Sequence, residues 1–457
     1  MTEQKNINIC LISLGCPKNL VDSEIMLGQL QEENFNLIVQ PEDAHVIIVN
    51  TCGFIDSAKE EAINTILEMA KYKEDKCKSL IVTGCLAQRY PDDIKKDIPE
   101  VDFILGVGNY SDIVYAVNSS LGNNDKSNLN GEVSACSILC SEIENLDYLN
   151  DKRIISTPKT YAYLKIAEGC DNRCTYCVIP YIRGSYISRR KEAVLKEAEF
   201  IIGSGYKEII LVAQDTTKYG EDLYGEYLLH ELLKDMCNIN GDFKIRILYC
   251  YPDKITDDLI DIIANNDKIC KYIDIPIQHG SDKILKAMGR KSDSGEIKET
   301  VNKLRKAIPD IYIRTSLITG FPGETNGDHK NLKSFLTKLR FDRAGVFEYS
   351  KQGGTKAAIM DKQVPADIIK KRMNEIMELQ RIISKEINEE RLGNVYDVIV
   401  EGVAQDNIFY FGRTYAEAPD IDGLIYFTAK QELKTGDNVK VKILNADDYD
   451  LTGEQII

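Results

Sequence analysis

Residues 162–177 read AYLKIAEGCDNRCTYC, an apolar run that leads directly into a loop with three cysteines. The run is typical of a buried β-strand. Cys170, Cys174 and Cys177 follow it with a C-x3-C-x2-C spacing. Three thiolates on so short a loop can ligate three irons of a cubane [4Fe-4S] cluster, which leaves the fourth iron without a protein ligand. The stretch therefore predicts a strand whose end carries an iron–sulfur cluster with one open iron.

The open iron indicates a second cofactor. The amino and carboxylate groups of S-adenosylmethionine (SAM) can chelate it, and an electron from the reduced cluster can then break the S–C5′ bond and release a 5′-deoxyadenosyl radical. We therefore expect radical SAM chemistry at Cys170, Cys174 and Cys177, with Tyr176 packed beside the adenine. The alternative is a structural zinc site or inert thiols. Zinc prefers four ligands in two close pairs, and no C-x2-C partner completes such a site here.

Strand-like runs and helical patterns continue to alternate downstream of this loop. The predicted strands are Ala162–Ala167, Glu208–Ala213, Lys244–Tyr249, Tyr272–Ile275, Ile311–Thr319 and Ala344–Tyr349. Six strand–helix units predict a partial or open (β/α)6 barrel rather than an eightfold one. A long charged amphipathic helix, Pro365–Glu390, follows. After it, short β runs broken by Gly and Asp predict a small antiparallel β-barrel over residues 391–457.

The chain upstream of the loop also alternates strands and helices. Its predicted strands are Ile7–Leu14, His45–Asn50, Ser79–Thr83 and Phe103–Leu105. This pattern predicts an α/β domain with a parallel sheet. A helix between the second and third strands is expected to start with a capping box, Ser57 with Glu60. Its apolar face is expected to hold Ala58, Ala62, Ile63, Ile66 and Leu67.

The domain limits follow from these changes of pattern. The segment 118–131 is rich in Asn, Ser and Gly and has no periodicity, so it predicts a boundary. We expect an N-terminal domain over residues 1–120, a linker over 121–156, a radical SAM core over 157–390 and the small barrel over 391–457.

Three more cysteines share a position in the N-terminal domain. Cys16, Cys52 and Cys85 each follow one of its predicted strands. Because open α/β sheets bind ligands at the carboxyl ends of their strands, cysteines that are far apart in sequence should converge there. Glycines beside them would let the backbone approach a bulky group. The sequence predicts a second [4Fe-4S] cluster with an open iron; the alternative is three unrelated buried thiols.

Further cofactor contacts are expected where other strands end. The segment 314–325 ends a strand in a Gly/Pro-rich turn, and its Arg314, Ser316 and Gly320 are candidates for contact with the ribose or amino-acid part of SAM. The alternative is that this Gly/Pro-rich turn only reverses the direction of the chain and binds no ligand. Gln214 and Asp215 are candidates for the cofactor amino group or the substrate, although a helix cap explains the pair equally well. Gln278 and His279 also follow a strand.

Composition narrows the function classes. The 457 residues include 13 cysteines, an odd number that fits metal binding better than a disulfide framework. The net charge of −15 argues against broad nucleic-acid binding and fits a basic partner. Met1–Asn8 is polar, and no run reaches the roughly 18 apolar residues of a membrane helix. We expect a cytoplasmic protein that contacts no membrane and does not bind nucleic acid directly.

Taken together, these motifs resemble the methylthiotransferase family of radical SAM enzymes over essentially the whole chain. Within the family, residues 13–24 (SLGCPKNLVDSE) are similar to the branch that modifies a ribosomal protein, because the transfer-RNA branch typically has Gln-Met-Asn where this chain has Pro17-Lys18-Asn19. The segments 50–55, 84–89, 177–184 and 412–423 carry the same resemblance.

The resemblance implies a specific reaction. The expected activity is methylthiolation of the β-carbon of an aspartate in ribosomal protein S12, with one SAM as methyl donor and another as radical source. The cluster at Cys16, Cys52 and Cys85 would hold the sulfur, and the C-terminal barrel, a TRAM domain, would hold the substrate. A reductant such as flavodoxin would be a further partner.

Two alternatives remain open. One is methylthiolation of a transfer-RNA adenosine. Residues 391–457 carry 6 Lys/Arg against 12 Asp/Glu, which suits a basic protein better than a polyanion. The other alternative is a non-catalytic iron–sulfur sensor or RNA-binding adaptor, for which an open iron has little use.

Overall fold

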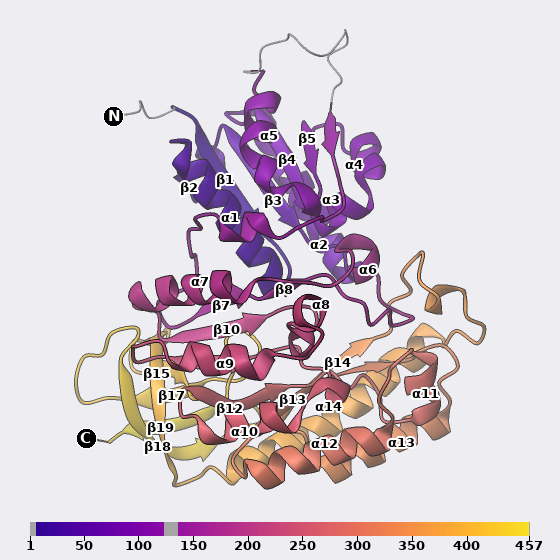
Figure 1. Cartoon of the computed structure of the whole chain (residues 1–457), viewed down its shortest axis with the longest axis vertical. Helices are drawn as coiled ribbons and strands as arrows, with labels where there is room; N and C mark the ends of the chain where they lie inside the picture. The colour runs from indigo at the N-terminus through magenta and orange to yellow at the C-terminus, as the bar shows by residue number, and fades with distance from the viewer. Residues whose placement is uncertain (1–5, 123–135, 457) are drawn as a thin grey trace. The chain divides into compact units, whose positions relative to one another are not determined.

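The computed structural model describes residues 6–122 and 136–456, and the chain divides into two compact units (Figure 1). The first unit contains the residues up to Ser156 together with Glu168–Arg173 and Cys177–Ile187. The second contains Thr157–Ala167, Cys174–Tyr176 and the chain from Ser188 onward. The chain passes between the units near two short strands, β8 (Ala167–Glu168) and β9 (Ile187–Ser188).

The first unit is built on a six-stranded sheet in the order β2-β1-β3-β4-β5-β6, and every pairing in it is parallel. Its strands are β1 (Asn8–Ser13), β2 (Asn36–Ile38), β3 (Val46–Thr51), β4 (Ser79–Gly84), β5 (Phe103–Leu105) and β6 (Ser137–Leu139). Every residue of the central strands β3 and β4 is buried, as expected for a parallel sheet covered on both faces. The predicted parallel α/β fold is confirmed.

Helices cover the two faces of this sheet. One face packs against α1 (Pro17–Glu32) and α5 (Ile113–Ser120), and the other packs against α2 (Asp56–Ala70) and α4 (Pro91–Asp97). The short helix α3 (Cys85–Arg89) directly follows β4. These helices hold the carboxyl ends of the strands in fixed positions.

Three details of the first unit differ from the sequence prediction. The three-residue strands β2 and β6, at the two edges of the sheet, were not predicted. Helix α2 starts at Asp56 with Ile55 as its N-cap, so Ser57 already lies inside the helix and the predicted capping box is wrong. The helix α5 extends to Ser120, inside the predicted boundary segment, and residues 123–131 of that segment lie outside the described residues.

The predicted apolar face of α2 is also partly wrong. Ala62 and Ile66 are buried as expected, but Ile63 and Leu67 are 40% and 46% exposed. The buried stripe instead continues through Met69 and Ala70. Two stripes with the same helical spacing lie side by side on this helix, and contact with the sheet selects one of them.

The second unit contains a parallel sheet whose six strands follow the chain order β7-β10-β11-β12-β13-β14. The strands are β7 (Ala162–Lys165), β10 (Glu208–Val212), β11 (Lys244–Ile247), β12 (Ile269–Asp274), β13 (Tyr312–Thr319) and β14 (Arg343–Glu348). The larger helices are α7 (Lys191–Gly203), α9 (Leu229–Cys237), α10 (Asp257–Asn265), α12 (Ser294–Ala307), α13 (Asn326–Leu339) and α14 (Ala366–Glu389). The open sheet confirms the predicted partial (β/α)6 barrel.

The C-terminal segment forms a closed barrel in the order β15-β16-β17-β19-β18. Its strands are β15 (Val395–Val403), β16 (Tyr410–Arg413), β17 (Ile425–Thr428), β18 (Asn438–Ala446) and β19 (Leu451–Gln455). The small barrel is confirmed, but it is not purely antiparallel, because β17 pairs with β19 in parallel. Turn and strand signals along the chain do not encode which strands close a barrel.

Buried polar contacts join this barrel to the parallel sheet within the second unit. Arg413 Nη1 lies 3.2 Å from Glu208 Oε2, and Arg246 Nη1 donates to the carbonyl of Tyr415 at 2.8 Å. Tyr272 Oη donates to Asp422 Oδ2 at 2.7 Å. Glu208 is the first residue of its strand, so the barrel contacts the amino-terminal part of the sheet and leaves the carboxyl ends of the strands to other partners. In the described part of the chain, no helix is both long and apolar enough to cross a membrane.

Candidate functional site

Cys16, Cys52 and Cys85 stand at the carboxyl ends of three strands of the first unit. Cys16 is the N-cap of α1, which follows β1; Cys52 directly follows β3; and Cys85 is the first residue of α3, which follows β4. These strands are neighbours in the order β1-β3-β4. The predicted strand-end placement is therefore confirmed, and one edge of the sheet brings together thiols that lie 33 and 36 residues apart along the chain.

The loops that carry these thiols pack tightly against one another. Gly15 has φ +88°, and a Cβ atom there would lie 2.7 Å from Cys52 Cβ and 3.1 Å from Cys52 Sγ. Gly84 has φ +94°, and a Cβ atom there would lie 2.5 Å from the carbonyl oxygen of Thr51. Only glycine combines this backbone conformation with so close an approach. The glycines therefore allow the cysteine loops to converge.

Burial and mutual charge shape the chemistry of this trio. Burial, together with the neighbouring Cys85 and Cys16, raises the pKa of Cys52 to about 11. Burial also raises the pKa of Cys85, while the adjacent Arg183 guanidinium opposes this increase. A negative charge on one thiol thus disfavours charge on the next. Three thiolates in this place need a compensating cation, and the irons of a cluster would supply it.

The thiols of the second trio each accept a nitrogen donor. Asn172 Nδ2 lies 3.5 Å from Cys170 Sγ, and the backbone N–H of Ile179 lies 3.4 Å from Cys177 Sγ. Within the second unit, Arg290 Nη1 lies 3.9 Å from Cys174 Sγ. Hydrogen bonds to the ligating sulfurs are a standard feature of iron–sulfur sites, so these surroundings fit thiolate ligands of a cluster.

Neither trio is arranged to hold a single ion. Among the described residues, no group of three or more His, Cys, Asp or Glu side chains could hold one metal ion. Zinc requires all its thiolates at about 2.3 Å from one centre, whereas a cubane spreads its three protein thiolates over three irons. The choice between a cluster and the zinc alternative therefore stays a prediction from the cysteine spacing.

The middle of the radical loop is anchored in the second unit. The Thr175 backbone N–H donates to the carbonyl of Met288 at 2.9 Å, and its hydroxyl donates to the carbonyl of Ala287 at 2.9 Å. Tyr176 packs edge-to-face on Phe321, with 6.5 Å between ring centroids. Tyr176 thus has an apolar environment of the kind that an adenine ring also favours; its predicted contact with adenine stays a prediction.

The predicted SAM contacts occupy different environments. Asp215 is fully buried after β10 and forms an ion pair with Lys254 Nζ at 2.6 Å. It is the N-cap residue of the short helix that follows, but its side chain makes no capping hydrogen bond. Gln214 precedes it and is partly buried. Arg314 Nη1 donates to Asp274 at 2.9 Å, and its Nε lies 3.7 Å from Asp422 of the barrel. This placement favours a structural role for Arg314.

The turn after β13 is built around Gly320. Its φ is +79°, and a Cβ atom there would lie 2.3 Å from Ile369 Cγ1. The backbone N–H of Gly320 donates to the Glu324 carboxylate at 2.5 Å, and Ser316 lies earlier in the same strand. His279 is fully buried, and its Nε2 has no hydrogen-bond partner among the described residues. The contact between Gly320 and Glu324 holds the turn in one conformation. The predicted contacts of Ser316 and Gly320 with SAM stay predictions.

Two arginines that were not predicted from the sequence lie beside ligand candidates. Arg290 approaches Cys174, and Arg183 approaches Cys85 Sγ at 3.3 Å. No sequence spacing predicts either contact, because each arginine lies far along the chain from its cysteine and only the fold brings the two together. The only usable signal was the Arg183-Gly184 dipeptide that follows Cys177.

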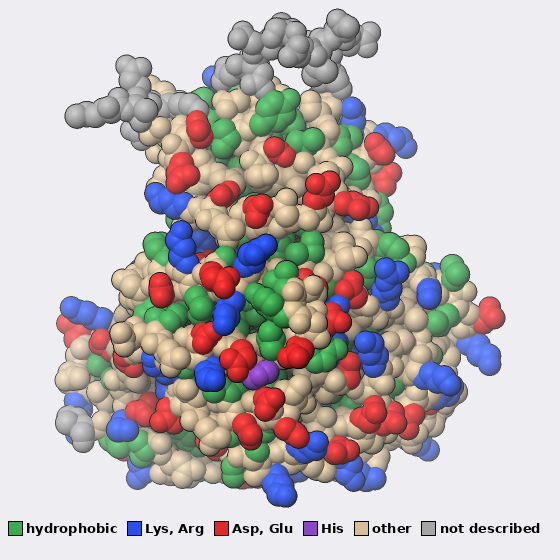
Figure 2. Space-filling view, in the orientation of Figure 1, with side chains coloured by type: hydrophobic (Ala, Val, Ile, Leu, Met, Phe, Trp, Pro, Cys, Tyr) green, Lys and Arg blue, Asp and Glu red, His purple; other side chains and the backbone are tan. Residues whose placement is uncertain are grey.

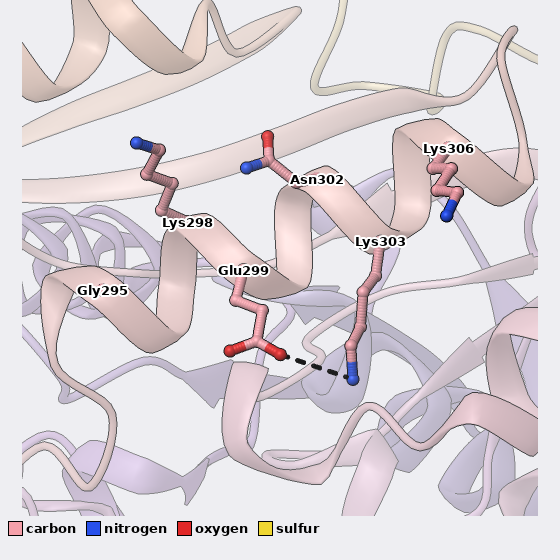
Figure 3. A pocket seen from close by; sticks show the side chains of 6 residues that line it. All are labelled: Gly295, Lys298, Glu299, Asn302, Lys303 and Lys306. Carbon is pink, nitrogen blue, oxygen red and sulfur yellow. Dashed lines mark ion pairs between the residues drawn. The ribbon is translucent and has the colours of Figure 1, made fainter.

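A surface hollow of the second unit carries no comparable chemistry. Figure 3 shows that the side chains lining it come from α12 alone: Gly295, Lys298, Glu299, Asn302, Lys303 and Lys306. Lys303 Nζ lies 3.7 Å from Glu299 Oε1 across one helical turn. One exposed helix face cannot enclose a cofactor, so this hollow is not a candidate site.

Comparisons with known proteins agree with the three-part organisation. The uncharacterized protein family UPF0004 matches residues 8–106, the Radical SAM superfamily matches residues 164–336 and the TRAM domain matches residues 392–456. The "Ribosomal protein uS12 methylthiotransferase RimO" of Acetivibrio thermocellus is 56% identical over 447 residues, which cover 98% of each chain.

The chain belongs to the RimO family. A relative of the same name from Clostridium botulinum (strain Langeland) is 50% identical over 450 residues, again 98% of each chain. Membership of the RimO family makes the chain a radical SAM methylthiotransferase, which confirms the predicted enzyme class. The Radical SAM match implies SAM and one [4Fe-4S] cluster as cofactors of this RimO family member.

Solved structures show the same fold at low identity. The radical SAM methyltransferase TsrM from Kitasatospora setae aligns with a TM-score of 0.58 and 13% identity, covering 85% of this chain and 80% of TsrM. The cobalamin-dependent radical SAM enzyme OxsB aligns with a TM-score of 0.52 and 14% identity, covering 82% of this chain and 56% of OxsB. At such identities the likeness extends to the fold alone and carries no cofactor or substrate of TsrM or OxsB to the RimO family.

Proposed function

We propose that this RimO family member methylthiolates the β-carbon of an aspartate in ribosomal protein S12 and that it uses two [4Fe-4S] clusters to do so. The substrate comes from the names of relatives that are 56% and 50% identical over almost the whole chain. The observation that carries the second cluster is the convergence of Cys16, Cys52 and Cys85 at one edge of the first sheet.

Each trio has a distinct task in this proposal. When bound, the cluster at Cys170, Cys174 and Cys177 supplies the electron that cleaves one SAM, and the cluster at the other trio carries the sulfur that a second SAM methylates. The chain fixes the thiols of Cys170, Cys174 and Cys177 by donating N–H groups to their sulfurs. It limits the access of water to the sulfur-carrying trio by burying Cys85 and half-burying Cys52 and Cys16.

Two measurements test this function. Anaerobically reconstituted protein should contain about eight irons per chain, as two cubane clusters require. Reduced protein with SAM should release 5′-deoxyadenosine, and S12 should gain about 46 Da, the mass of one sulfur plus one CH2. A content of about four irons, or S12 of unchanged mass in cells with and without the gene, would refute the proposal.

The charge of the barrel favours a protein substrate over transfer RNA. Of its acidic residues, Asp397, Asp406, Asp420, Glu432, Asp437, Asp447 and Glu454 are exposed, whereas its exposed basic residues are Lys430, Lys434, Lys440 and Lys442. Both barrel arginines, Arg391 and Arg413, are buried in ion pairs with Glu417 and Glu208 and offer no charge to a partner. An excess of exposed carboxylates repels phosphate and attracts a basic ribosomal protein.

Charge reversal separates the two substrates. Replacing Asp406, Glu432 and Asp437 by Lys should raise KM for S12 several-fold and leave 5′-deoxyadenosine formation without S12 unchanged. Unchanged KM for S12 would contradict a substrate role for this surface, and activity on transfer RNA in the unaltered chain would support the adenosine alternative. A reduced protein that forms no 5′-deoxyadenosine at all would support the sensor alternative.

The remaining partners follow from the chemistry. Reductive cleavage of SAM consumes one electron per radical, so a low-potential donor such as flavodoxin serves the cluster at Cys170, Cys174 and Cys177. A ribosomal-protein substrate assigns the reaction to the cytoplasm. The proposal also keeps the predicted domain limits: an N-terminal domain that ends at residue 120, a linker that ends at 156 and a radical SAM core that ends at 390.

A further inference from the structure

Arg183 of the first unit is buried beside a candidate cluster ligand. It follows Cys177 by six residues, and its side chain is 2% exposed. A buried guanidinium has lost its hydration and must find partners in the protein. Arg183 finds them among residues of the first unit that flank both cysteine trios, and the proposed chemistry of the two trios does not use it.

One edge of the guanidinium faces a single sulfur. Arg183 Nε lies 3.4 Å from Cys85 Sγ, and Nη2 of the same edge lies 3.3 Å from it. Two donors held by one planar group fix both the position and the direction of the acceptor. A lysine could bring the same charge but only as a single point.

The other edge is held by carboxylates. Arg183 Nη1 lies 2.8 Å from Asp22 Oδ2 and 3.0 Å from Glu168 Oε2. Asp22 lies on α1, which starts after Cys16, and Glu168 lies two residues before Cys170. These two anchors prevent the guanidinium from rotating away from Cys85.

Asn19 extends the contacts to the remaining cysteine loops. Its Oδ1 accepts from Arg183 Nη2 at 2.5 Å. Its Nδ2 donates to the carbonyl of Leu14 at 3.1 Å and to the carbonyl of Thr51 at 2.9 Å. Leu14 precedes Cys16 by two residues, and Thr51 directly precedes Cys52. Arg183 and Asn19 therefore connect all three loops of the first-unit trio.

We propose that Arg183, with Asn19, is a positioning residue for the cluster at Cys16, Cys52 and Cys85: it fixes Cys85 Sγ and raises the reduction potential of that cluster. The proposal rests on the proposed two-cluster function. N–H donors to a ligating sulfur stabilise the added negative charge of the reduced cluster, so their loss makes reduction harder.

The test uses the full chain carrying Cys170→Ala, Cys174→Ala and Cys177→Ala, in which only the first-unit trio can hold a cluster. The midpoint potential is measured by redox titration followed by electron paramagnetic resonance, and iron per chain is measured after anaerobic gel filtration. Arg183→Gln should shift the potential to more negative values and lower the retained iron at least twofold. Arg183→Lys, which keeps the charge, should give a smaller shift in the same direction.

Tyr110→Phe is the matched control. The Tyr110 hydroxyl lies 3.4 Å from Arg183 Nη2, so the variant alters the same guanidinium without removing a donor to the sulfur. Its potential should equal that of the parent. An unchanged potential and iron content in Arg183→Gln would overturn the proposal, as would an equal shift in Tyr110→Phe.

Two further measurements distinguish failure of this proposal from misfolding of a variant and from failure of the two-cluster function. If circular dichroism shows that Arg183→Gln is unfolded, Arg183→Lys and Asn19→Ala decide: a negative shift or loss of iron in both supports the proposal, and parent-like behaviour in both overturns it. A parent protein that binds no cluster would instead refute the two-cluster function on which the proposal rests.

Discussion

Cys170, Cys174 and Cys177 lie within one short loop, whereas Cys16, Cys52 and Cys85 come from the ends of three neighbouring strands. In the first case covalent spacing alone brings the thiols together. In the second, the thiols meet through a parallel sheet, and tight glycine turns and a buried arginine lie beside them. A ligand set can thus be local or entirely tertiary in the same chain, and the tertiary set depends on the stability of its unit.

The largest effects are expected when one ligand of either cysteine trio is removed. Cys174→Ala should abolish 5′-deoxyadenosine formation, because the loop then lacks a ligand for its cluster. Cys52→Ala should retain part of that cleavage but yield no methylthiolated S12. Chromatography of the nucleoside product and mass spectrometry of S12 measure the two activities. Full retention of both activities in both variants would remove the division of labour.

The dependence of the first-unit trio on backbone geometry can be tested at a glycine. Gly84→Ala should destabilise the first unit by about 3 kcal/mol, because it combines strain at positive φ with a backbone clash. Gly436 has nearly the same φ, +93° against +94°, but an added Cβ meets nothing within 4 Å there. Gly436→Ala should therefore cost only about 1 kcal/mol. Urea denaturation followed by circular dichroism compares the two, and equal costs would contradict a packing role for Gly84.

The reactivity of the Cys52 thiol in the first-unit trio should depend on pH. The folded pKa of Cys52 is raised to about 11, so its reactive thiolate is scarce at neutral pH. In cluster-free folded protein, alkylation of Cys52 should therefore rise about tenfold per pH unit from pH 8 to 10 without reaching a plateau. In urea the same thiol should level off above about pH 8.5, its ordinary pKa. Mass spectrometry of the alkylated peptide gives both profiles, and a plateau below pH 9 in the folded protein would argue against burial as the cause.

The smallest effect is expected away from both trios. Lys303 and Glu299 form a solvent-exposed pair on α12, with side chains 52% and 70% exposed. Lys303→Ala should change the free energy of unfolding by less than about 0.5 kcal/mol and leave SAM cleavage unchanged. A larger loss of cleavage would show that the hollow on this helix has a role in the reaction.

Charged side chains mark the limits of the sequence analysis. Figure 2 shows Lys, Arg, Asp and Glu mixed over the face in view, so type alone does not single out a functional charge. Arg314 was predicted to contact SAM because it lies near a strand end, yet it pairs with Asp274 and approaches Asp422. Arg183 was not predicted at all, although it contacts Cys85. A long cationic side chain reaches several ångströms, and only the fold determines which carboxylate or sulfur lies within that reach.

The sequence by itself determined the features that depend on local spacing: the cysteine loop after β7, most strands of both sheets and the strand-end positions of Cys16, Cys52 and Cys85. Chain connectivity and hydrophobic periodicity are encoded residue by residue, so these features can be read without coordinates. The tertiary structure alone decided which face of α2 is buried, how the barrel closes through β17 and β19, and which side chains meet Cys85. Those choices arise from packing between segments far apart in the chain, where many pairings satisfy the same local pattern and only one fills the core.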